Sequence, residues 1–163
     1  MTNAFVTRAG WLAYGVAAAV VAVDQVTKQW VLKTLLLPGT SVDVIGPLSL
    51  TLVWNRGASF GLLRTDLDWS RWVLTAFALV VAVGLGLFAR RQEKLMTGIS
   101  LGLILAGALG NVIDRIRMGA VVDFIDVQRL HFPWVFNVAD ASINVGVALL
   151  LLEGVLSSRR KPA

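Results

Sequence analysis

Apolar residues form four long stretches along this chain, and short polar segments separate them. We expect helices over about residues 9–35, 69–89, 95–115 and 135–156. A helix of about 20 residues spans the hydrocarbon core of a bilayer, so each stretch is long enough to cross it. The pattern predicts an integral membrane α-helical protein in which residues 1–163 form one domain with four transmembrane helices.

The first apolar stretch resembles a secretory signal peptide, with Arg8 followed by an apolar core and the small residues Ala17–Ala19. Its far end also carries Asp24 and Lys28, and cleavage would remove these polar residues. We therefore expect a retained transmembrane helix.

The first long connection, about residues 36–68, contains an alternating pattern. Apolar and β-branched residues predominate over 42–45 and 48–54, and Pro38-Gly39 and Gly46-Pro47 mark turns on either side of the first segment. This pattern predicts a small β-element on the outer face. Asp66 or Asp68 is expected to cap the second transmembrane helix. The second outer connection, about 116–134, is expected to be a loop.

Composition strengthens the membrane assignment, because 56% of residues are hydrophobic, only 15% are charged and the mean hydropathy is +0.73. The net charge of +5 does not indicate nucleic-acid binding, since the basic residues form no long run interleaved with aromatic residues. Short segments on one side of the predicted membrane contain Arg8, Arg90, Arg91, Lys94, Arg159, Arg160 and Lys161. The longer connections contain only Arg56, Arg64, Arg117 and Arg129. The positive-inside rule then places both termini in the cytoplasm.

Two acidic residues, Asp123 and Asp140, lie in apolar surroundings. An ionised carboxylate in hydrocarbon is costly unless it is paired or hydrated, so such residues are functional candidates. The helical rise places Asp140 and Asp24 at a similar depth just below the outer interface. Because the chain has no cysteine and only one histidine, His131, it cannot form a thiolate or multi-histidine metal site. Two carboxylates that act on water need no metal and no cofactor, so we expect none.

Other polar residues recur at helical spacing. Asn137, Asp140 and Asn144 are three and four residues apart, which predicts one helical face directed into the bundle. Gly107, Asn111 and Asp114 or Arg115 form a matching stripe, and Gly98 and Gly102 would allow another helix to approach closely. Structural ion pairs are expected between Asp24 and Lys28, and between Asp114 and Arg115 or Arg117.

Five ordered sequence blocks give the chain a resemblance to the bacterial lipoprotein signal peptidases (signal peptidase II) along essentially its whole length. They are Asp24-Gln25-Val26-Thr27-Lys28, Asn55-Arg56-Gly57-Ala58-Ser59-Phe60, Gly107-Ala108-Leu109-Gly110-Asn111-Val112-Ile113-Asp114-Arg115, Val121-Val122-Asp123-Phe124-Ile125 and Phe136-Asn137-Val138-Ala139-Asp140. One departure is Ala141, where a small hydroxyl residue is common in the family.

The resemblance implies an aspartic endopeptidase that cleaves diacylglyceryl-modified prolipoproteins just before the lipidated cysteine. Asp123 and Asp140 match the family's catalytic pair, which would share a proton and activate water. The expected supporting residues are Asp24, Lys28, Asn55, Gly57, Gly107, Asn111, Asp114, Arg115, Asn137 and Ala139. The resemblance also implies a monomer in the bacterial cytoplasmic (inner) membrane, contacting membrane lipids and no nucleic acid, with its active site near the outer leaflet.

Two alternatives remain open from the sequence. Gly57–Gly61 matches the GxSxG pattern of a serine hydrolase, with His131 as the sole available base for Ser59. A small proton-coupled transporter that uses an intramembrane aspartate is the non-enzymatic alternative.

Overall fold

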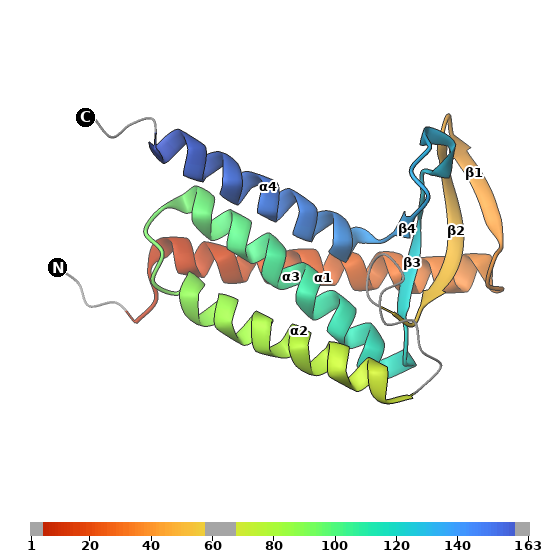
Figure 1. The fold of residues 1–163 in the computed structure, drawn as a ribbon, viewed down its shortest axis with the longest axis horizontal. Helices are drawn as coiled ribbons and strands as arrows, with labels where there is room; N and C mark the ends of the chain where they lie inside the picture. The colour runs from red at the N-terminus through yellow and green to blue at the C-terminus, as the bar shows by residue number, and fades with distance from the viewer. Residues whose placement is uncertain (1–4, 58–67, 159–163) are drawn as a thin grey trace.

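The computed structural model describes residues 5–57 and 68–158, and within them four helices cross the molecule (Figure 1). The helices are α1 (Arg8–Leu35), α2 (Asp68–Ala89), α3 (Leu95–Met118) and α4 (Val138–Ser158). Each is long and apolar enough to span a membrane. The expected helical membrane architecture is therefore confirmed.

Large apolar side chains on the outside of the bundle support the same conclusion. Phe77, Val80 and Val83 of α2 are 68%, 72% and 61% exposed. In water such a surface would be an aggregation hazard, whereas lipid tails cover it without cost. Many of the buried positions between the helices are instead small or polar, among them Ala9, Ala13, Asp24 and Lys28.

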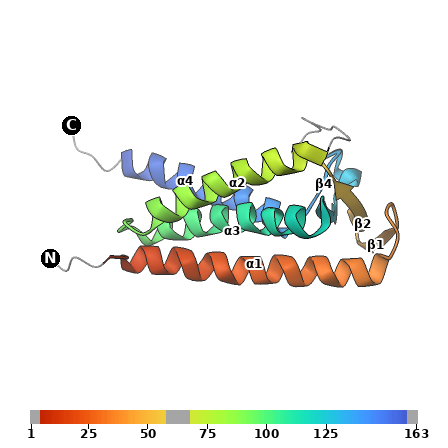
Figure 2. The ribbon, with the colours of Figure 1, turned by 90° about the horizontal axis from the view of Figure 1, so that it is seen from below.

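Helix α3 lies at the centre of the bundle and contacts the other three helices (Figure 2). Gly98 and Gly102 face α1, where a Cβ atom would come within 2.5 Å of the carbonyl oxygens of Ala9 and Ala13. The absence of a side chain lets the two backbones approach, as the glycine spacing predicted. This close packing fixes α1 against α3 along the half of the bundle farthest from the sheet.

A four-stranded antiparallel sheet covers one end of the bundle (Figure 1). Its strands, in spatial order, are β1 (Ser41–Ile45), β2 (Leu48–Asn55), β3 (Val121–Asp126) and β4 (Val135–Phe136). The first two match the predicted β-element. The connection expected as a loop over 116–134 instead contains β3, a short 3-10 helix at Gln128–Leu130 and the approach to β4. Residues 121–124 are all buried, so β3 lacks the alternation that reveals a half-exposed strand.

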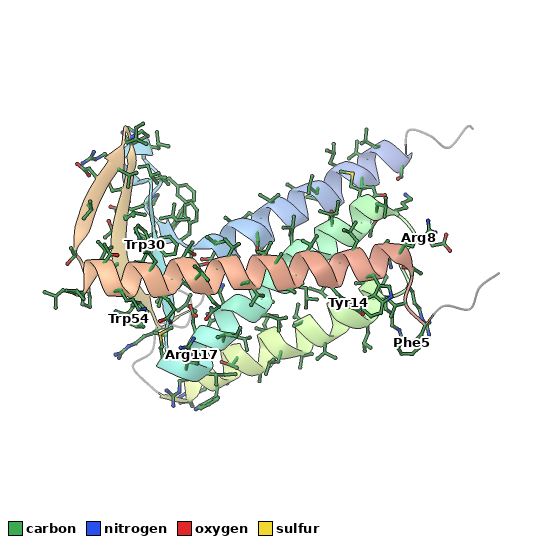
Figure 3. The ribbon with its side chains drawn as sticks, turned by 180° about the vertical axis from the view of Figure 1, so that it is seen from behind. Phe5, Arg8, Tyr14, Trp30, Trp54 and Arg117 are labelled. Carbon is green, nitrogen blue, oxygen red and sulfur yellow. The ribbon has the colours of Figure 1, made fainter. Side chains whose placement is uncertain are left out.

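The last turns of α1 support the sheet from below. Val31 and Leu35 of α1 form a buried cluster with Leu52 of β2 and with Val122 and Phe124 of β3. In Figure 3 this end of α1 carries Trp30 and lies beside Trp54 and the sheet. Because strand residues alternate in direction, Asp123 faces away from this cluster.

Two helix boundaries differ from the sequence expectation. Helix α3 continues past residue 115 to Met118 and ends at Gly119, whose φ of 77° lies in the left-handed region that favours glycine. Helix α4 begins at Val138 and not near 135, because Val135 and Phe136 pair with β3. The expected cap at Asp66 and the serine Ser59 lie outside the described residues.

Candidate active site

Asp123 and Asp140 reach the same place from different elements. Asp123 belongs to β3, and Asp140 belongs to the first turn of α4. Asp123 accepts hydrogen bonds from Asn55 Nδ2 at 3.0 Å and from Asn137 Nδ2 at 2.7 Å, and Asp140 Oδ1 accepts one from Asn111 Nδ2 at 2.8 Å. Three amide side chains therefore hold two carboxylates.

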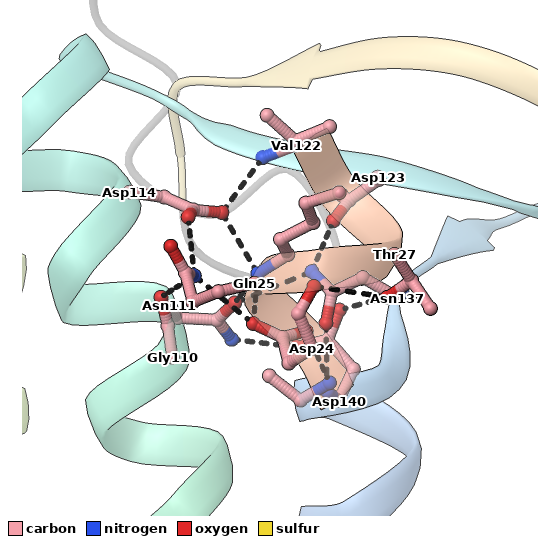
Figure 4. A network of polar contacts seen from close by, with 12 residues as sticks. Asp24, Gln25, Thr27, Gly110, Asn111, Asp114, Val122, Asp123, Asn137 and Asp140 are labelled. Carbon is pink, nitrogen blue, oxygen red and sulfur yellow. Dashed lines mark hydrogen bonds and ion pairs between the residues drawn. The ribbon is translucent and has the colours of Figure 1, made fainter. Parts of the chain in front are cut away.

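Asn137 links the two aspartates directly (Figure 4). Its side-chain Oδ1 accepts from the backbone N–H of Asp140 at 2.9 Å, while its Nδ2 donates to Asp123 and to Asn111 Oδ1. Asn137 is thus the N-cap of α4, so the expectation that it belongs to the helix itself is wrong. Asp140 and Asn144 do share one face of α4, and Asn144 is exposed on it.

Both aspartates line a cavity of about 380 Å³ between the sheet and α4. Its wall contains aromatic residues from the connection before α4, where the Phe132 ring packs edge-on against those of Trp134 and Phe136. The full lining is Asn55, Asp123, Phe132, Trp134, Val135, Phe136, Asp140, Ala141, Asn144 and Val145. The cavity combines an apolar wall with a polar floor.

Burial and, second to it, the negative charge of Asp140 together raise the pKa of Asp123 to about 7, against the lowering effects of its amide donors Asn55 and Asn137 and of Lys28. Two neighbouring carboxylates cannot both ionise easily, so the pair favours holding one proton between them. The arrangement can therefore supply a base and an acid at the same time.

Lys28 occupies a fully buried site behind the two aspartates. Its ammonium group lies 2.9 Å from Asp24 Oδ2 and 2.8 Å from Asp114 Oδ2, and donates to Asn111 Oδ1 at 3.3 Å. The predicted pair of Asp24 with Lys28 is present. The predicted pair of Asp114 with Arg115 or Arg117 is wrong, because α1 packs against α3 and brings Lys28 to Asp114.

The two acids beside Lys28 also accept hydrogen bonds from the backbone. Asp24 Oδ1 accepts from the N–H of Ala139 at 2.9 Å, and Asp114 Oδ2 accepts from the N–H of Val122 at 3.2 Å. Ala139 precedes Asp140, and Val122 precedes Asp123. Asp24 therefore fixes the backbone directly before Asp140, and Asp114 fixes the backbone directly before Asp123.

Glycines on α3 allow this convergence. A side chain at Gly107 would collide with the carbonyl oxygen of Ala139, and a Cβ at Gly110 would lie 2.7 Å from Asp24 Oδ2. Helix α4 and the Asp24 carboxylate can approach α3 only because both positions lack side chains.

The end of β2 connects to α3 through Arg115. Arg115 Nη2 donates to the carbonyl oxygen of Gly57 at 3.2 Å, and the N–H of Gly57 donates to Asn55 Oδ1 at 3.0 Å. These two bonds orient the Asn55 amide so that its nitrogen reaches Asp123.

The chain matches the family described as signal peptidase (SPase) II over residues 16–156. It belongs to the signal peptidase II family. The lipoprotein signal peptidase of Caulobacter vibrioides is 50% identical to it, covering 99% of this chain and 96% of the relative. That of Methylobacterium sp. (strain 4-46) is 42% identical, covering 93% of each chain. The expected aspartic peptidase of a bacterial membrane is therefore confirmed.

Solved structures agree with the fold. A bacterial membrane enzyme solved by the in meso method at 2.3 Å resolution has a TM-score of 0.80 and 32% identity, covering 93% of this chain and 92% of its own. A second such enzyme, at 1.9 Å resolution, has a TM-score of 0.74 and 33% identity over 86% and 90% of the two chains. The bundle and its sheet are thus shared with experimentally determined membrane enzymes.

The two aspartates and the ten supporting residues expected from the sequence all lie at this cavity or in the polar cluster behind it. The spacing of polar residues indicated neither a role for Gln25 nor the aromatic cavity wall. Three aromatic residues within five positions, Phe132, Trp134 and Phe136, could have indicated the cavity wall from the sequence. Gln25 stands in the first motif block, but nothing in its spacing indicated its contacts with Gly110 and Asp114, which lie 85 and 89 residues away along the chain.

Proposed function

We propose that this enzyme removes the signal peptide from diacylglyceryl-modified prolipoproteins by cleaving on the N-terminal side of the lipidated cysteine. Asp123 and Asp140 act as a catalytic pair that shares one proton and activates water. The observation that carries the proposal is their convergence, from β3 and α4, on one partly apolar cavity.

The chemistry follows from the shared proton. One carboxylate removes a proton from water as the water oxygen attacks the scissile carbonyl carbon, and the other donates its proton to the carbonyl oxygen. As the tetrahedral intermediate collapses, the C–N bond breaks and the leaving amine takes the proton that the first carboxylate removed from water. The second carboxylate takes a proton back from a hydroxyl of the intermediate as the C=O bond re-forms, which restores the singly protonated pair. The aspartates need no group beyond water for this sequence.

The asparagines keep the pair in position. Asn137 binds both aspartates, Asn111 binds Asp140, and Asn55 binds Asp123. Fixed amide donors hold each carboxylate in one rotamer, which preserves the geometry that water attack requires. Arg115 and Gly57 support Asn55, while Gly107 and Ala139 allow the start of α4 to approach α3.

The position of the cavity suits a lipid-linked substrate. It lies at the sheet end of the bundle, and Val145, on its α4 side, is 51% exposed on the surface that faces lipid. A substrate with acyl chains can then enter sideways from the bilayer, with its alkyl chains against Phe132 and Trp134. The substrate and surrounding lipids are the only partners we propose for this monomer.

The proposed orientation places the sheet on the outer face of the cytoplasmic membrane. Arg8 and Ser158 lie at the opposite end of the bundle, together with the α2–α3 connection that contains Arg90, Arg91 and Lys94 (Figures 1 and 3). Basic residues accumulate on the cytoplasmic side of membrane proteins, which favours both termini inside.

The catalytic pair predicts a pH dependence. Because Asp123 has a pKa of about 7, it holds its proton below that pH and loses it above. We expect kcat/KM to fall as pH rises through about 7, since the doubly ionised pair has no proton to donate. Steady-state cleavage assays in detergent across this pH range measure kcat/KM. Return of activity when the pH is lowered again is the control for denaturation. A kcat/KM that stays constant well above neutral pH would contradict the mechanism.

Substrate class is tested with one precursor prepared with and without its diacylglyceryl group. Each buried methylene contributes about 0.8 kcal/mol, so we expect kcat/KM for the unlipidated form to be lower by at least about a hundredfold. Cleavage is followed by electrophoresis and the cut position by mass spectrometry. Equal cleavage of both forms would exclude the assigned specificity, and absence of cleavage of either would exclude the proposed reaction.

A further inference from the structure

Gln25 lies on α1 beside Asp24 and faces the buried cluster (Figure 4). Its Nε2 donates to Asp114 Oδ1 at 2.9 Å, to Asp24 Oδ2 at 3.2 Å and to the carbonyl oxygen of Gly110 at 3.3 Å. Two amide protons are therefore shared among three acceptors, two of which belong to the acids that flank Lys28.

The orientation of the Gln25 amide is determined by its surroundings. Its Oε1 accepts from Arg117 Nη1 at 3.4 Å, on the side away from the acids. Turning the amide over would place its oxygen against two carboxylates and a carbonyl, and its nitrogen against a guanidinium. Only the observed orientation pairs every donor with an acceptor.

Asp24 and Asp114 connect this cluster to the proposed catalytic pair. Asp24 holds the N–H of Ala139, next to Asp140, and Asp114 holds the N–H of Val122, next to Asp123. A rotation of either carboxylate would thus move the backbone that carries one catalytic aspartate. The relative position of β3 and α4 depends on both carboxylates at once.

Lys28 alone does not fix these rotations. An ammonium group is a compact charge that attracts both carboxylates but imposes little direction on them. The Gln25 amide is planar, and it contacts the Asp114 oxygen that Lys28 does not. Lys28 therefore supplies the positive charge of the cluster, while the Gln25 amide fixes the rotation of the Asp114 carboxylate and joins it to Asp24 Oδ2.

We propose that Gln25 is a positioning residue, which couples Asp24 to Asp114 and so sets the separation of Asp123 and Asp140 through the backbone of Ala139 and Val122. The inference rests on the proposed function of Asp123 and Asp140. Gln25 is absent from the cavity lining and does not touch the reacting atoms.

The test compares Gln25→Met with Gln29→Met. Methionine keeps the length and shape of the side chain but removes both amide donors. Gln29 is half-buried one turn further along α1, and no hydrogen bond joins its side chain to this cluster in the described part of the chain. We expect Gln25→Met to lower kcat about tenfold and to leave KM within about twofold, because a small displacement of reacting groups affects the chemical step. Gln29→Met should leave both unchanged.

A pH profile separates positioning from general stability. Asp123 is influenced by Asp140, whose charge raises its pKa, and by Lys28 and Arg115 as the nearby cations. If Gln25→Met lets the pair separate, the contribution of Asp140 shrinks and the alkaline limb of kcat/KM moves to lower pH. If Gln25→Met only destabilised the fold, the melting temperature and the fraction of folded enzyme would fall, but the alkaline limb of the kcat/KM profile would stay at the same pH.

Gln25→Glu provides the second variant. Its shape and its contact with Arg117 are retained, but a carboxylate replaces the donor between two other carboxylates, so kcat should fall further than in Gln25→Met. Wild-type kcat and an unmoved limb in either variant would overturn the role of Gln25 while leaving the proposed function intact. Full cleavage by Asp123→Asn would instead overturn the proposed function itself.

Discussion

Replacing Asp123 or Asp140 with asparagine is expected to reduce kcat by about a thousandfold or more. An asparagine amide neither accepts a proton from water nor donates one to the leaving group. The proposed mechanism needs both carboxylates, one as base and one as acid, so losing either should stop the reaction. The measurement is cleavage of a lipidated precursor by purified enzyme in detergent, with enough enzyme to detect the residual rate.

The asparagine variants should remain folded. A buried carboxyl whose pKa is raised is costly when ionised, and replacing Asp123 with a neutral amide removes that cost. The amide accepts at one oxygen where the carboxylate accepts at two, so one contact with Asn55 or Asn137 weakens. We therefore expect a melting temperature close to that of the wild type.

Asp126→Asn is the matched control for the catalytic pair. Asp126 also lies on β3, but it accepts from Thr51 Oγ1 and from the N–H of Gln128, away from the cavity. Its asparagine variant should retain near wild-type activity. Substantial turnover by Asp123→Asn or Asp140→Asn, with the control also active, would refute the catalytic pair.

Lys28→Met is expected to destabilise the fold by about 3–5 kcal/mol. The change leaves Asp24 and Asp114 fully buried without their cation, and an uncompensated buried charge is strongly unfavourable. Because both acids accept hydrogen bonds from the backbone next to Asp123 and Asp140, the proposed catalytic pair, activity should fall with stability. Thermal unfolding in detergent, monitored by circular dichroism, provides the measurement.

Two further variants serve as controls for Lys28→Met. Lys33→Met, on the exposed face of the same helix, should change stability little. The triple variant Asp24→Asn, Lys28→Met and Asp114→Asn removes all three charges and should recover part of the lost stability. A stable single variant, or a triple variant less stable than Lys28→Met, would show that the ion cluster is not what holds these elements together.

The sequence predicted the membrane architecture because the information is local. Apolar runs of sufficient length define the four helices, and the small residues Gly98 and Gly102 indicate where two of them approach. The depth estimate also placed Asp24 and Asp140 together, and the structure joins Asp24 to the N–H of Ala139, directly before Asp140. Ordered motifs supplied the family, which the comparisons confirm.

Some elements were misjudged because burial hides periodicity. Strand β3 is buried at four successive positions, so its sequence lacks the alternation of a half-exposed strand, and Asp123 was placed on a loop. Asn137 has helical spacing to Asp140, yet it caps α4 because the two preceding residues pair with β3. Spacing alone cannot distinguish a helical residue from its cap.

Hydrophobic length and helical rise depend only on neighbours in the chain, so the residues alone specify a four-helix membrane protein with two costly aspartates. The packing of the helices and the sheet is needed to show that Asp24 and Asp114 share Lys28, that Gln25 joins those two acids, and that aromatic residues line the cavity. A buried polar group must bind whichever partner the packing brings to it, and for Gln25 and Lys28 a partner lies more than 80 residues away along the chain.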